Sequence, residues 1–191
     1  LGTRLGKMTE KTPKSLIEVA GKPMLHHILN WAQRQGCMHA LILTGHLGEQ
    51  FEGIAHPGMA LTFHQEHEPL GTGGALWNAR ELLEERFILV WGDDLHPVEY
   101  SPLLTLHQSM NSPLTMTITE AHSSMNLRHK DGQLIEYDKH TKSSHTLNGY
   151  EAGTSVVEQS TLLEYGKDGK WSWEETVYPA LSGKALTHLD N

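Results

Sequence analysis

The sequence predicts an α/β protein with a mostly parallel central sheet that is flanked by helices, and with an added β-hairpin. Segments with helical spacing alternate with short apolar runs, as in successive helix–strand units. A glycine-rich turn precedes one helical segment, and one apolar run ends in Gly-Asp. An acidic strand end of this kind places a carboxylate at the edge where open α/β sheets bind ligands.

The first part of the chain contains two helix–strand units. Apolar residues recur at helical spacing after Pro23, and Gly36 supplies a stop. Residues 38–44, M-H-A-L-I-L-T, form a short apolar run between two glycines, which predicts a buried strand. A helix over residues 47–54 and a strand over residues 60–64 are expected to follow.

The rest of the chain continues the alternation. Residues 68–76, E-P-L-G-T-G-G-A-L, predict a glycine-rich turn that leads into a helix. Residues 87–94, F-I-L-V-W-G-D-D, predict a strand with an acidic end. A hairpin is expected at the Asp131-Gly132 turn. Further helices are predicted over 102–110 and 173–181, and a further strand over 114–121.

Composition narrows the classes of function. The 191 residues contain no linker-like stretch, so one domain is expected. The formal net charge of -8 and the absence of a Lys/Arg-rich block argue against nucleic acid as a partner. No apolar run approaches the roughly 20 residues of a membrane span, and we expect a cytoplasmic protein. Cys37 stands alone and the 14 histidines lack ligand spacing, so neither a disulfide nor a histidine metal site is expected.

The first 25 residues carry the densest set of candidate ligand-binding groups. Gly2 allows a tight turn and a close approach of the backbone to a ligand. Arg4 supplies a permanently charged fork, and Lys14 supplies a mobile charge. Pro13 and Pro23 break a continuous helix, so the stretch is interpreted as a long surface loop. This pattern favours a phosphate-binding loop, and a solvated charged loop is the plain alternative.

These residues resemble the signature of the sugar-1-phosphate nucleotidylyltransferases, also called nucleotide-sugar pyrophosphorylases. The family motif reads roughly G-G-x-G-T-R-L, a spacer, P-K, and then G-K-P. The chain matches it at residues 2–5, 13–14 and 21–23. We therefore expect residues 1–191 to form a single nucleotidylyltransferase domain with a Rossmann-like nucleotidyltransferase fold. It is expected to lack the family's first strand and its carboxy-terminal metal motif.

The resemblance implies roles for individual residues. Arg4 and Lys14 would be catalytic through their contacts with phosphate, and Asp93 would be catalytic as the ligand of Mg²⁺. The implied nucleotide-binding residues are Gly2, Thr3, Gly71, Thr72 and Gly73. The implied sugar-phosphate-binding residues are Lys139, Glu151 and Gly153.

Each of these interpretations has a structural alternative. The glycines at 71 and 73 can serve a sterically required turn. Asp93 can cap the turn that follows its strand, and Lys139 can be an exposed hairpin lysine without a role. Trp171 and Trp173 can stack on a sugar, although packing in the core is the more common fate of tryptophan.

The implied reaction joins a nucleoside triphosphate and a sugar 1-phosphate to give a nucleotide sugar and pyrophosphate. Positioning and charge stabilisation suffice for it, because a phosphate dianion is already deprotonated near neutral pH. The segments P-L-G-T-G-G-A-L and Y-E-A-G look most like the branch that uses GTP with heptose or mannose 1-phosphate.

Other functions remain open at this point. Relatives that use UTP or dTTP share most of the same residues, and a non-catalytic nucleotide-sugar-binding regulatory domain would also resemble this chain. A Rossmann-type oxidoreductase is disfavoured, because no G-x-G-x-x-G follows a strand. The resemblance also leaves room for a homo-oligomer.

Overall fold

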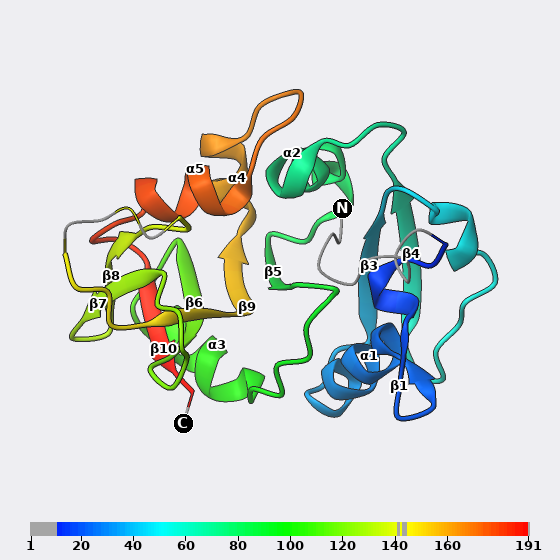
Figure 1. Cartoon of the computed structure of the whole chain (residues 1–191), viewed down its shortest axis with the longest axis horizontal. Coiled ribbons are helices and arrows are strands. Elements are labelled where there is room, and N and C mark those ends of the chain that lie inside the picture. The colour runs from blue at the N-terminus through cyan, green and yellow to red at the C-terminus, as the bar shows by residue number, and fades with distance from the viewer. Residues whose placement is uncertain (1–10, 141, 143–144, 191) are drawn as a thin grey trace. The chain divides into compact units, whose positions relative to one another are not determined.

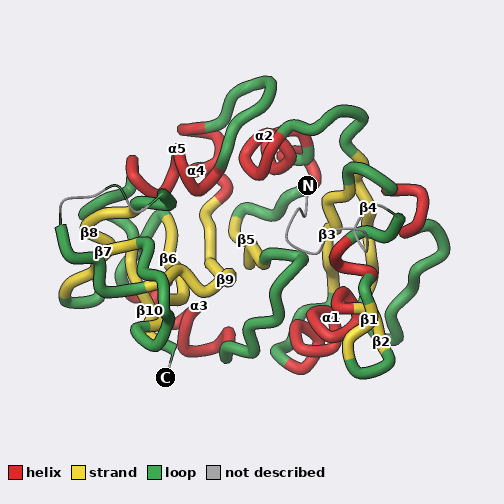
Figure 2. Tube along the Cα trace, in the orientation of Figure 1, coloured by secondary structure: helices red, strands yellow, loops and turns green. Residues whose placement is uncertain are grey.

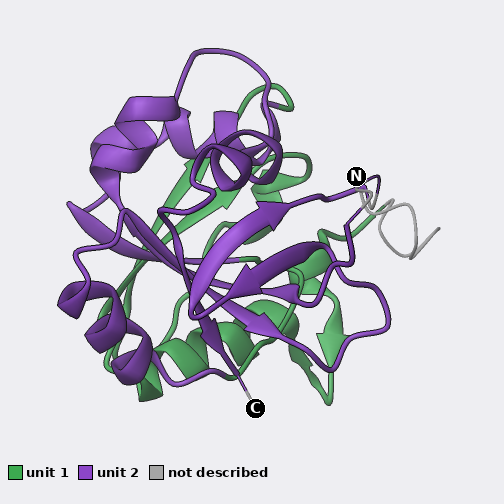
Figure 3. Cartoon of the chain, turned by 90° about the vertical axis from the view of Figure 1, so that its left-hand side faces the viewer, with its two compact units in different colours: residues 1–69, 91–97 green, residues 70–90, 98–191 purple. Residues whose placement is uncertain are grey.

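The computed structural model describes residues 11–140, 142 and 145–190, and the chain folds into two compact units (Figures 1 and 3). Unit 1 comprises residues 1–69 and 91–97, and unit 2 comprises residues 70–90 and 98–191. The expectation of a single domain stays a prediction. No helix in the described part of the chain is both long and apolar enough to cross a membrane.

Unit 1 is built on a parallel pair of strands, β3 (His39–Thr44) and β4 (Ala60–Gln65), with helix α1 (Met24–Arg34) beside them (Figure 2). Gly36 follows α1 with a φ of 94°, which confirms the predicted helix stop. The core of this unit contains the buried residues Leu25, Leu29, Phe51 and Met59. The first predicted helix and both predicted strands are therefore confirmed, although β3 is mostly half-buried rather than buried.

Short elements complete unit 1. They are the 3-10 helices η2 (Lys14–Leu16) and η3 (Gly48–Phe51), and the two-stranded ribbon of β1 (Glu18–Val19) and β2 (Lys22–Pro23). The helix predicted over 47–54 is wrong in extent, because only η3 forms there. Leu47 and Gly53 flank it with φ values of 63° and 77°, and a right-handed helix cannot extend through either position.

Unit 2 is built on a six-stranded sheet with the order β5-β9-β6-β10-β8-β7. Its strands are β5 (Arg86–Val90), β6 (Leu114–Thr119), β7 (Leu127–Lys130), β8 (Gln133–Tyr137), β9 (Tyr150–Glu158) and β10 (Leu186–Leu189). The α/β class is confirmed, whereas the pairing is mixed rather than mostly parallel. Strands β6 and β10 pair in parallel. Strand β9 runs antiparallel to both of its neighbours, so it separates β5 from β6 although these two share a direction.

Helices cover both sides of this sheet. The helices of unit 2 are α2 (Gly71–Asn78), η4 (Arg80–Leu82), α3 (Tyr100–Ser109), α4 (Gln159–Tyr165) and α5 (Trp173–Ala180). Figure 1 shows α4 and α5 above the sheet of unit 2 and α3 below it. Helix α3 packs on the central strands β6, β9 and β10, and α5 packs on β8. The helices predicted after the glycine-rich turn and over 102–110 and 173–181 are thus confirmed.

The predicted hairpin is formed by β7 and β8. Asp131 and Gly132 connect these strands with φ values of 50° and 76°. Positive φ at both central residues is the geometry of a type I′ turn, which matches the twist of the two strands. The Asp-Gly sequence signal therefore located this turn correctly.

Strand β10 is absent from the predicted elements, yet it lies inside the sheet between β6 and β8. Its four residues, L-T-H-L, pair in register with residues 115–118 of β6. So short a segment gives little local signal, and its conformation depends on a pairing with residues far away in the sequence.

His107 of α3 forms a buried polar link in unit 2. Its Nδ1 lies 2.9 Å from Thr115 Oγ1, and its Nε2 lies 2.9 Å from Glu158 Oε1. The same carboxylate accepts a hydrogen bond from Arg86 Nε at 2.6 Å. Burial lowers the pKa of His107, and this effect outweighs the hydrogen bond and negative charge of Glu158, which act to raise it.

We expect acid to destabilise the fold through His107. Its pKa is lower in the folded than in the unfolded chain, so the unfolded chain binds the proton more readily. The free energy of unfolding in urea should therefore fall as the pH drops below about 6.5, the ordinary pKa of histidine. A His107→Gln variant should be less stable at pH 7.5 but should lose less stability on acidification. Equal pH dependence in the two proteins would contradict this role.

Candidate active site

Lys14 and Asp93, two of the predicted catalytic residues, form an ion pair in unit 1. Lys14 is the first residue of η2, directly after Pro13, and Asp93 lies in the loop that follows β5. Lys14 Nζ donates to Asp93 Oδ2 at 2.7 Å. Their side chains are 37% and 48% exposed, so both are open to a ligand from solvent. The structure brings together residues that lie 79 positions apart in the sequence.

The Asp93 carboxylate suits a magnesium ion that arrives with its substrate. No group of three or more His, Cys, Asp or Glu side chains within the described ranges is placed to hold a metal ion. Magnesium is commonly held by one or two carboxylates together with substrate phosphates and water. The accessible oxygen atoms of Asp93 fit that mode, and a closed cage made only of described side chains does not form here.

The glycine-rich turn at the start of α2 packs against the segment that contains Trp171. The backbone N–H groups of Gly73 and Gly74 donate to the Trp171 carbonyl at 3.1 and 3.4 Å. A Cβ atom added at Gly73 would lie 2.1 Å from the Trp171 ring, and Gly71 has a φ of 74°. The steric interpretation therefore accounts for glycine at these positions. Nucleotide binding by Gly71, Thr72 and Gly73 stays a prediction.

Trp171 and Trp173 belong to the core rather than to an open stacking platform. Their exposed fractions are 7% and 0%. The Trp171 ring lies against the glycine turn, and Trp173 packs edge-on against Tyr178 of α5. The packing interpretation of both tryptophans is confirmed.

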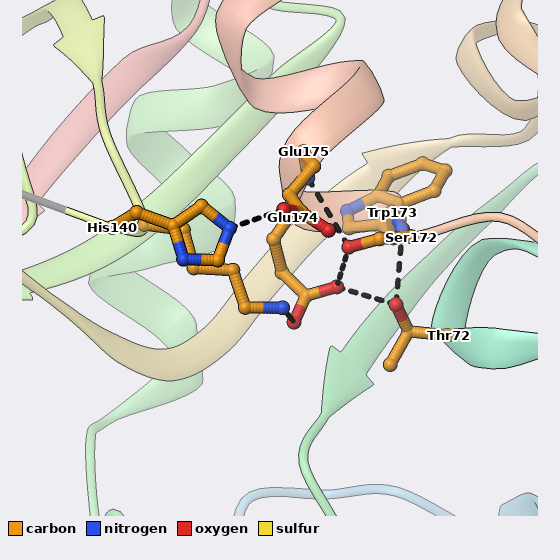
Figure 4. A network of polar contacts seen from close by, with 7 residues as sticks. Thr72, His140, Ser172, Trp173, Glu174 and Glu175 are labelled. Atoms are coloured by element: carbon orange, nitrogen blue, oxygen red, sulfur yellow. Dashed lines mark hydrogen bonds and ion pairs between the residues drawn. The ribbon is translucent and has the colours of Figure 1, made fainter. Parts of the chain in front are cut away.

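Thr72 and Lys139 both bind the carboxylate of Glu174 (Figure 4). The Thr72 hydroxyl donates to Oε2, and Lys139 Nζ donates to Oε1 at 3.1 Å. The backbone N–H of Trp173 donates to the Thr72 hydroxyl at 3.0 Å. A predicted nucleotide-binding residue and a predicted sugar-phosphate-binding residue thus share one carboxylate, although their sequence positions are far apart.

Glu174 itself is absent from the predicted site residues. Burial opposes its ionisation, but hydrogen bonds from Thr72, from its own backbone N–H and from Lys139 hold its pKa below the ordinary value. Glu174 and Glu175 both stand in the first turn of α5, where acidic residues are commonly found because they complement the helix dipole. Their sequence therefore gives no sign that only one of them faces the glycine turn.

Glu151 and Gly153, the other predicted sugar-site residues, contact each other on β9. Glu151 Oε1 accepts a hydrogen bond from the Gly153 backbone N–H at 2.9 Å, and Glu151 is 8% exposed. Gly153 has a φ of 90°, which favours glycine. Here the pairing of β9 with β6 shifts register, from Met116 opposite Ser155 to Ile118 opposite Glu151. The bulge in β9 therefore sets the position of Glu151.

The remaining predicted residues, Gly2, Thr3 and Arg4, lie outside the described residues. Comparison with known proteins nevertheless covers that part of the chain. Residues 1–128 match the family model described as nucleotidyl transferase. The chain belongs to this family. The family resemblance inferred from the motifs is confirmed.

Relatives of this nucleotidyl transferase include the D-glycero-α-D-manno-heptose 1-phosphate guanylyltransferase of Aneurinibacillus thermoaerophilus. The two are 30% identical over 187 residues, which cover 92% of this chain and 78% of the relative. The mannose-1-phosphate guanylyltransferase of Mycobacterium tuberculosis is 27% identical over 94% of this chain and 52% of its own length. A probable glucose-1-phosphate cytidylyltransferase of Bacillus subtilis is 26% identical over 91% of this chain and 78% of its own length. The chain thus spans about half the length of the mannose-specific relative.

Solved structures share the fold of this nucleotidyl transferase. The crystal structure of HddC from Yersinia pseudotuberculosis gives a TM-score of 0.79 at 24% identity and covers 99% of this chain and 86% of that protein. A putative glucose-1-phosphate thymidylyltransferase from Bacillus anthracis gives a TM-score of 0.84 at 16% identity, over 100% of this chain and 83% of its own. At these identities the likeness supports the α/β fold.

We expect Gly73→Ala to destabilise the nucleotidyl transferase in the absence of any ligand. The new Cβ would collide with the buried Trp171 ring, so the free energy of unfolding should fall by about 1–3 kcal/mol, the usual range for overpacking. Gly92→Ala is the matched control, because a Cβ there would meet no atom of the described residues within 4 Å beyond its two chain neighbours. Equal denaturation midpoints for Gly73→Ala and the unmodified protein would contradict the packing interpretation.

Proposed function

We propose that this nucleotidyl transferase transfers a nucleoside monophosphate from a nucleoside triphosphate to a sugar 1-phosphate, with GTP and heptose or mannose 1-phosphate as its substrates. The observation that carries the proposal is the 30% identity with the heptose 1-phosphate guanylyltransferase, which extends over 92% of this chain. The mannose-1-phosphate guanylyltransferases among the relatives support the same branch. We also propose a cytoplasmic location, since the substrates include a nucleoside triphosphate.

The proposed reaction needs charge stabilisation rather than a protein nucleophile. An oxygen of the sugar phosphate would form a bond to the α-phosphorus, and the bond between that phosphorus and the departing pyrophosphate would break. Lys14 and Arg4 would neutralise charge on the phosphates, Arg4 through a bidentate fork and Lys14 as a point charge. Asp93 would hold Mg²⁺, which supplies further charge neutralisation when it is bound.

The ion pair in unit 1 supports these roles for Lys14 and Asp93. Asp93 Oδ2 lies 2.7 Å from Lys14 Nζ, so the two proposed phosphate- and metal-binding groups stand next to each other. Exposed ion pairs contribute only about 0–1 kcal/mol, so phosphate and a metal ion could replace this one at little cost. On the sugar side, Lys139 would bind the sugar phosphate, while Glu151 and the backbone at Gly153 would face the sugar.

Pyrophosphate release tests the proposed substrates. We expect release with GTP and either heptose or mannose 1-phosphate, assayed with Mg²⁺ against a panel that includes UTP, dTTP and CTP. Turnover with UTP or dTTP but not with GTP would contradict the proposed nucleotide and would indicate a UTP- or dTTP-dependent sugar nucleotidylyltransferase. Binding of a nucleotide sugar without any pyrophosphate release would favour the non-catalytic regulatory domain and contradict the proposal.

Asp93→Asn should abolish most of the Mg²⁺-dependent turnover. We expect kcat to fall by about 100-fold or more, the scale of losing one charge-stabilising group in a reaction centre. The fold should persist, because the ion pair that is lost is exposed. Asp94→Asn removes an equally charged neighbour and serves as the control in the same assay. Near-normal turnover of Asp93→Asn, or an equal loss in both variants, would argue against a metal role for Asp93.

A further inference from the structure

We infer that Glu174 is a positioning residue that holds the glycine turn at Thr72 and the lysine at Lys139 in one fixed arrangement (Figure 4). The inference rests on the proposed function, in which Lys139 binds the sugar phosphate, and on the prediction that the glycine turn binds the nucleoside triphosphate. Glu174 acts through these two residues and is not itself a catalytic residue.

The two oxygen atoms of Glu174 serve different segments of the chain. Oε1 accepts a hydrogen bond from Nζ of Lys139, which lies two residues after the end of β8, at 3.1 Å. Oε2 accepts from the hydroxyl of Thr72 at the start of α2 and from the hydroxyl of Ser172 at 3.1 Å. The side chain of Glu174 is 13% exposed. One partly buried carboxylate thereby connects three segments that are distant in the sequence.

The orientation of Thr72 is determined by this carboxylate and by the backbone beside it. Its hydroxyl accepts from the Trp173 N–H at 3.0 Å and donates its single proton to Glu174. A hydroxyl carries one proton, so the hydrogen bond to Glu174 sets the orientation of the O–H bond of Thr72. The N–H groups of Gly73 and Gly74 bind the Trp171 carbonyl, which attaches the same turn to the same segment.

A carboxylate suits this position because both partners donate to it. The ammonium group of Lys139 can only donate, and the Thr72 hydroxyl accepts from the Trp173 N–H and donates its one proton to Glu174. Glutamine offers one oxygen and one amide nitrogen. With its oxygen on Lys139 it would turn an amide N–H toward Thr72, which can accept it only by directing its own proton elsewhere, and without the negative charge it would hold Lys139 less strongly.

The adjacent residue supplies a matched control. Glu175 Oε1 binds His140 Nε2 at 2.6 Å, next in sequence to the residues of the Lys139–Glu174 pair (Figure 4). Both members of this second pair are about half exposed, at 55% for His140 and 45% for Glu175. Glu175 also lies in the first turn of α5, and its hydrogen bonds go to His140 and Ser172, outside the glycine turn. Glu175→Gln thus removes the same charge and leaves the acceptor of the Thr72 hydroxyl in place.

Glu174→Gln and Glu175→Gln test the inference in the full chain. We expect Glu174→Gln to raise the KM values for the nucleoside triphosphate and for the sugar 1-phosphate by about tenfold each, the scale of losing a charge-assisted hydrogen bond. Glu175→Gln should leave both KM values within about twofold, as expected for an exposed pair. An effect of Glu174→Gln on the free energy of unfolding alone, with both KM values unchanged, would overturn the inference.

Double variants test whether Glu174 acts through its two partners. In a Lys139→Met background, Glu174→Gln should still raise the KM for the triphosphate but no longer the KM for the sugar 1-phosphate. In a Thr72→Val background, Glu174→Gln should still raise the KM for the sugar 1-phosphate but no longer the KM for the triphosphate. Full additivity in both backgrounds would mean that Glu174 does not act through these residues, and would overturn the inference.

Amide hydrogen exchange separates a failure of this inference from a failure of the proposed function. The absence of pyrophosphate release from the unmodified protein would contradict the proposed function only. Glu174→Gln should speed exchange in both 70–74 and 137–140, because both segments lose the same anchor. Glu175→Gln should leave exchange in 70–74 unchanged. Unchanged exchange in 70–74 of Glu174→Gln would overturn the positioning role, whatever the activity.

Discussion

The Glu174 carboxylate is the interaction that joins two candidate binding residues of unit 2, Thr72 and Lys139. The glycine turn, the segment after β8 and the start of α5 each present donors to it, and few other groups could accept them all. The ionised form is favoured because several hydrogen bonds outweigh the cost of burial. Local packing adds to the effect, since the Trp171 ring occupies the space that a side chain at Gly73 would need. The glycine turn is therefore held both by the hydrogen bond of Thr72 to the Glu174 carboxylate and by the packing of Gly73 against the Trp171 ring.

Two predicted phosphate-binding lysines are each paired with a carboxylate, and the two pairs differ in character. Lys14 and Asp93 are both substantially exposed, so water screens their attraction and a polyanion can compete for the lysine. Lys139 binds a carboxylate that is 13% exposed and that other donors also hold. The Lys14–Asp93 ion pair is therefore suited to break when a substrate binds. The Lys139–Glu174 ion pair is suited to remain in place.

Much of the fold follows from sequence patterns because its determinants are local. Helix α1 follows from an apolar stripe and a glycine stop, and the β7–β8 hairpin follows from Asp131-Gly132. Strand β10 and the direction of β9 depend on pairing between segments that are distant in the sequence, and a local hydrophobic pattern does not predict such pairing. Motifs likewise predicted Lys14, Asp93, Thr72 and Lys139 as site residues. Glu174 was missed because only burial and its partners distinguish it from Glu175.

The bulge in β9 has a consequence for how this region can vary. Between the pairs Met116–Ser155 and Ile118–Glu151, β9 contains more residues than β6, and Gly153 lies in that stretch. Side chains alternate between the two faces of a strand, so the loss of one residue there would exchange the faces for everything on one side of the deletion. Homologous chains can replace the side chain at 151 and thereby alter what the sheet presents. The loss of a single residue from this stretch would therefore move Glu151 to the opposite face of β9 relative to Ser155.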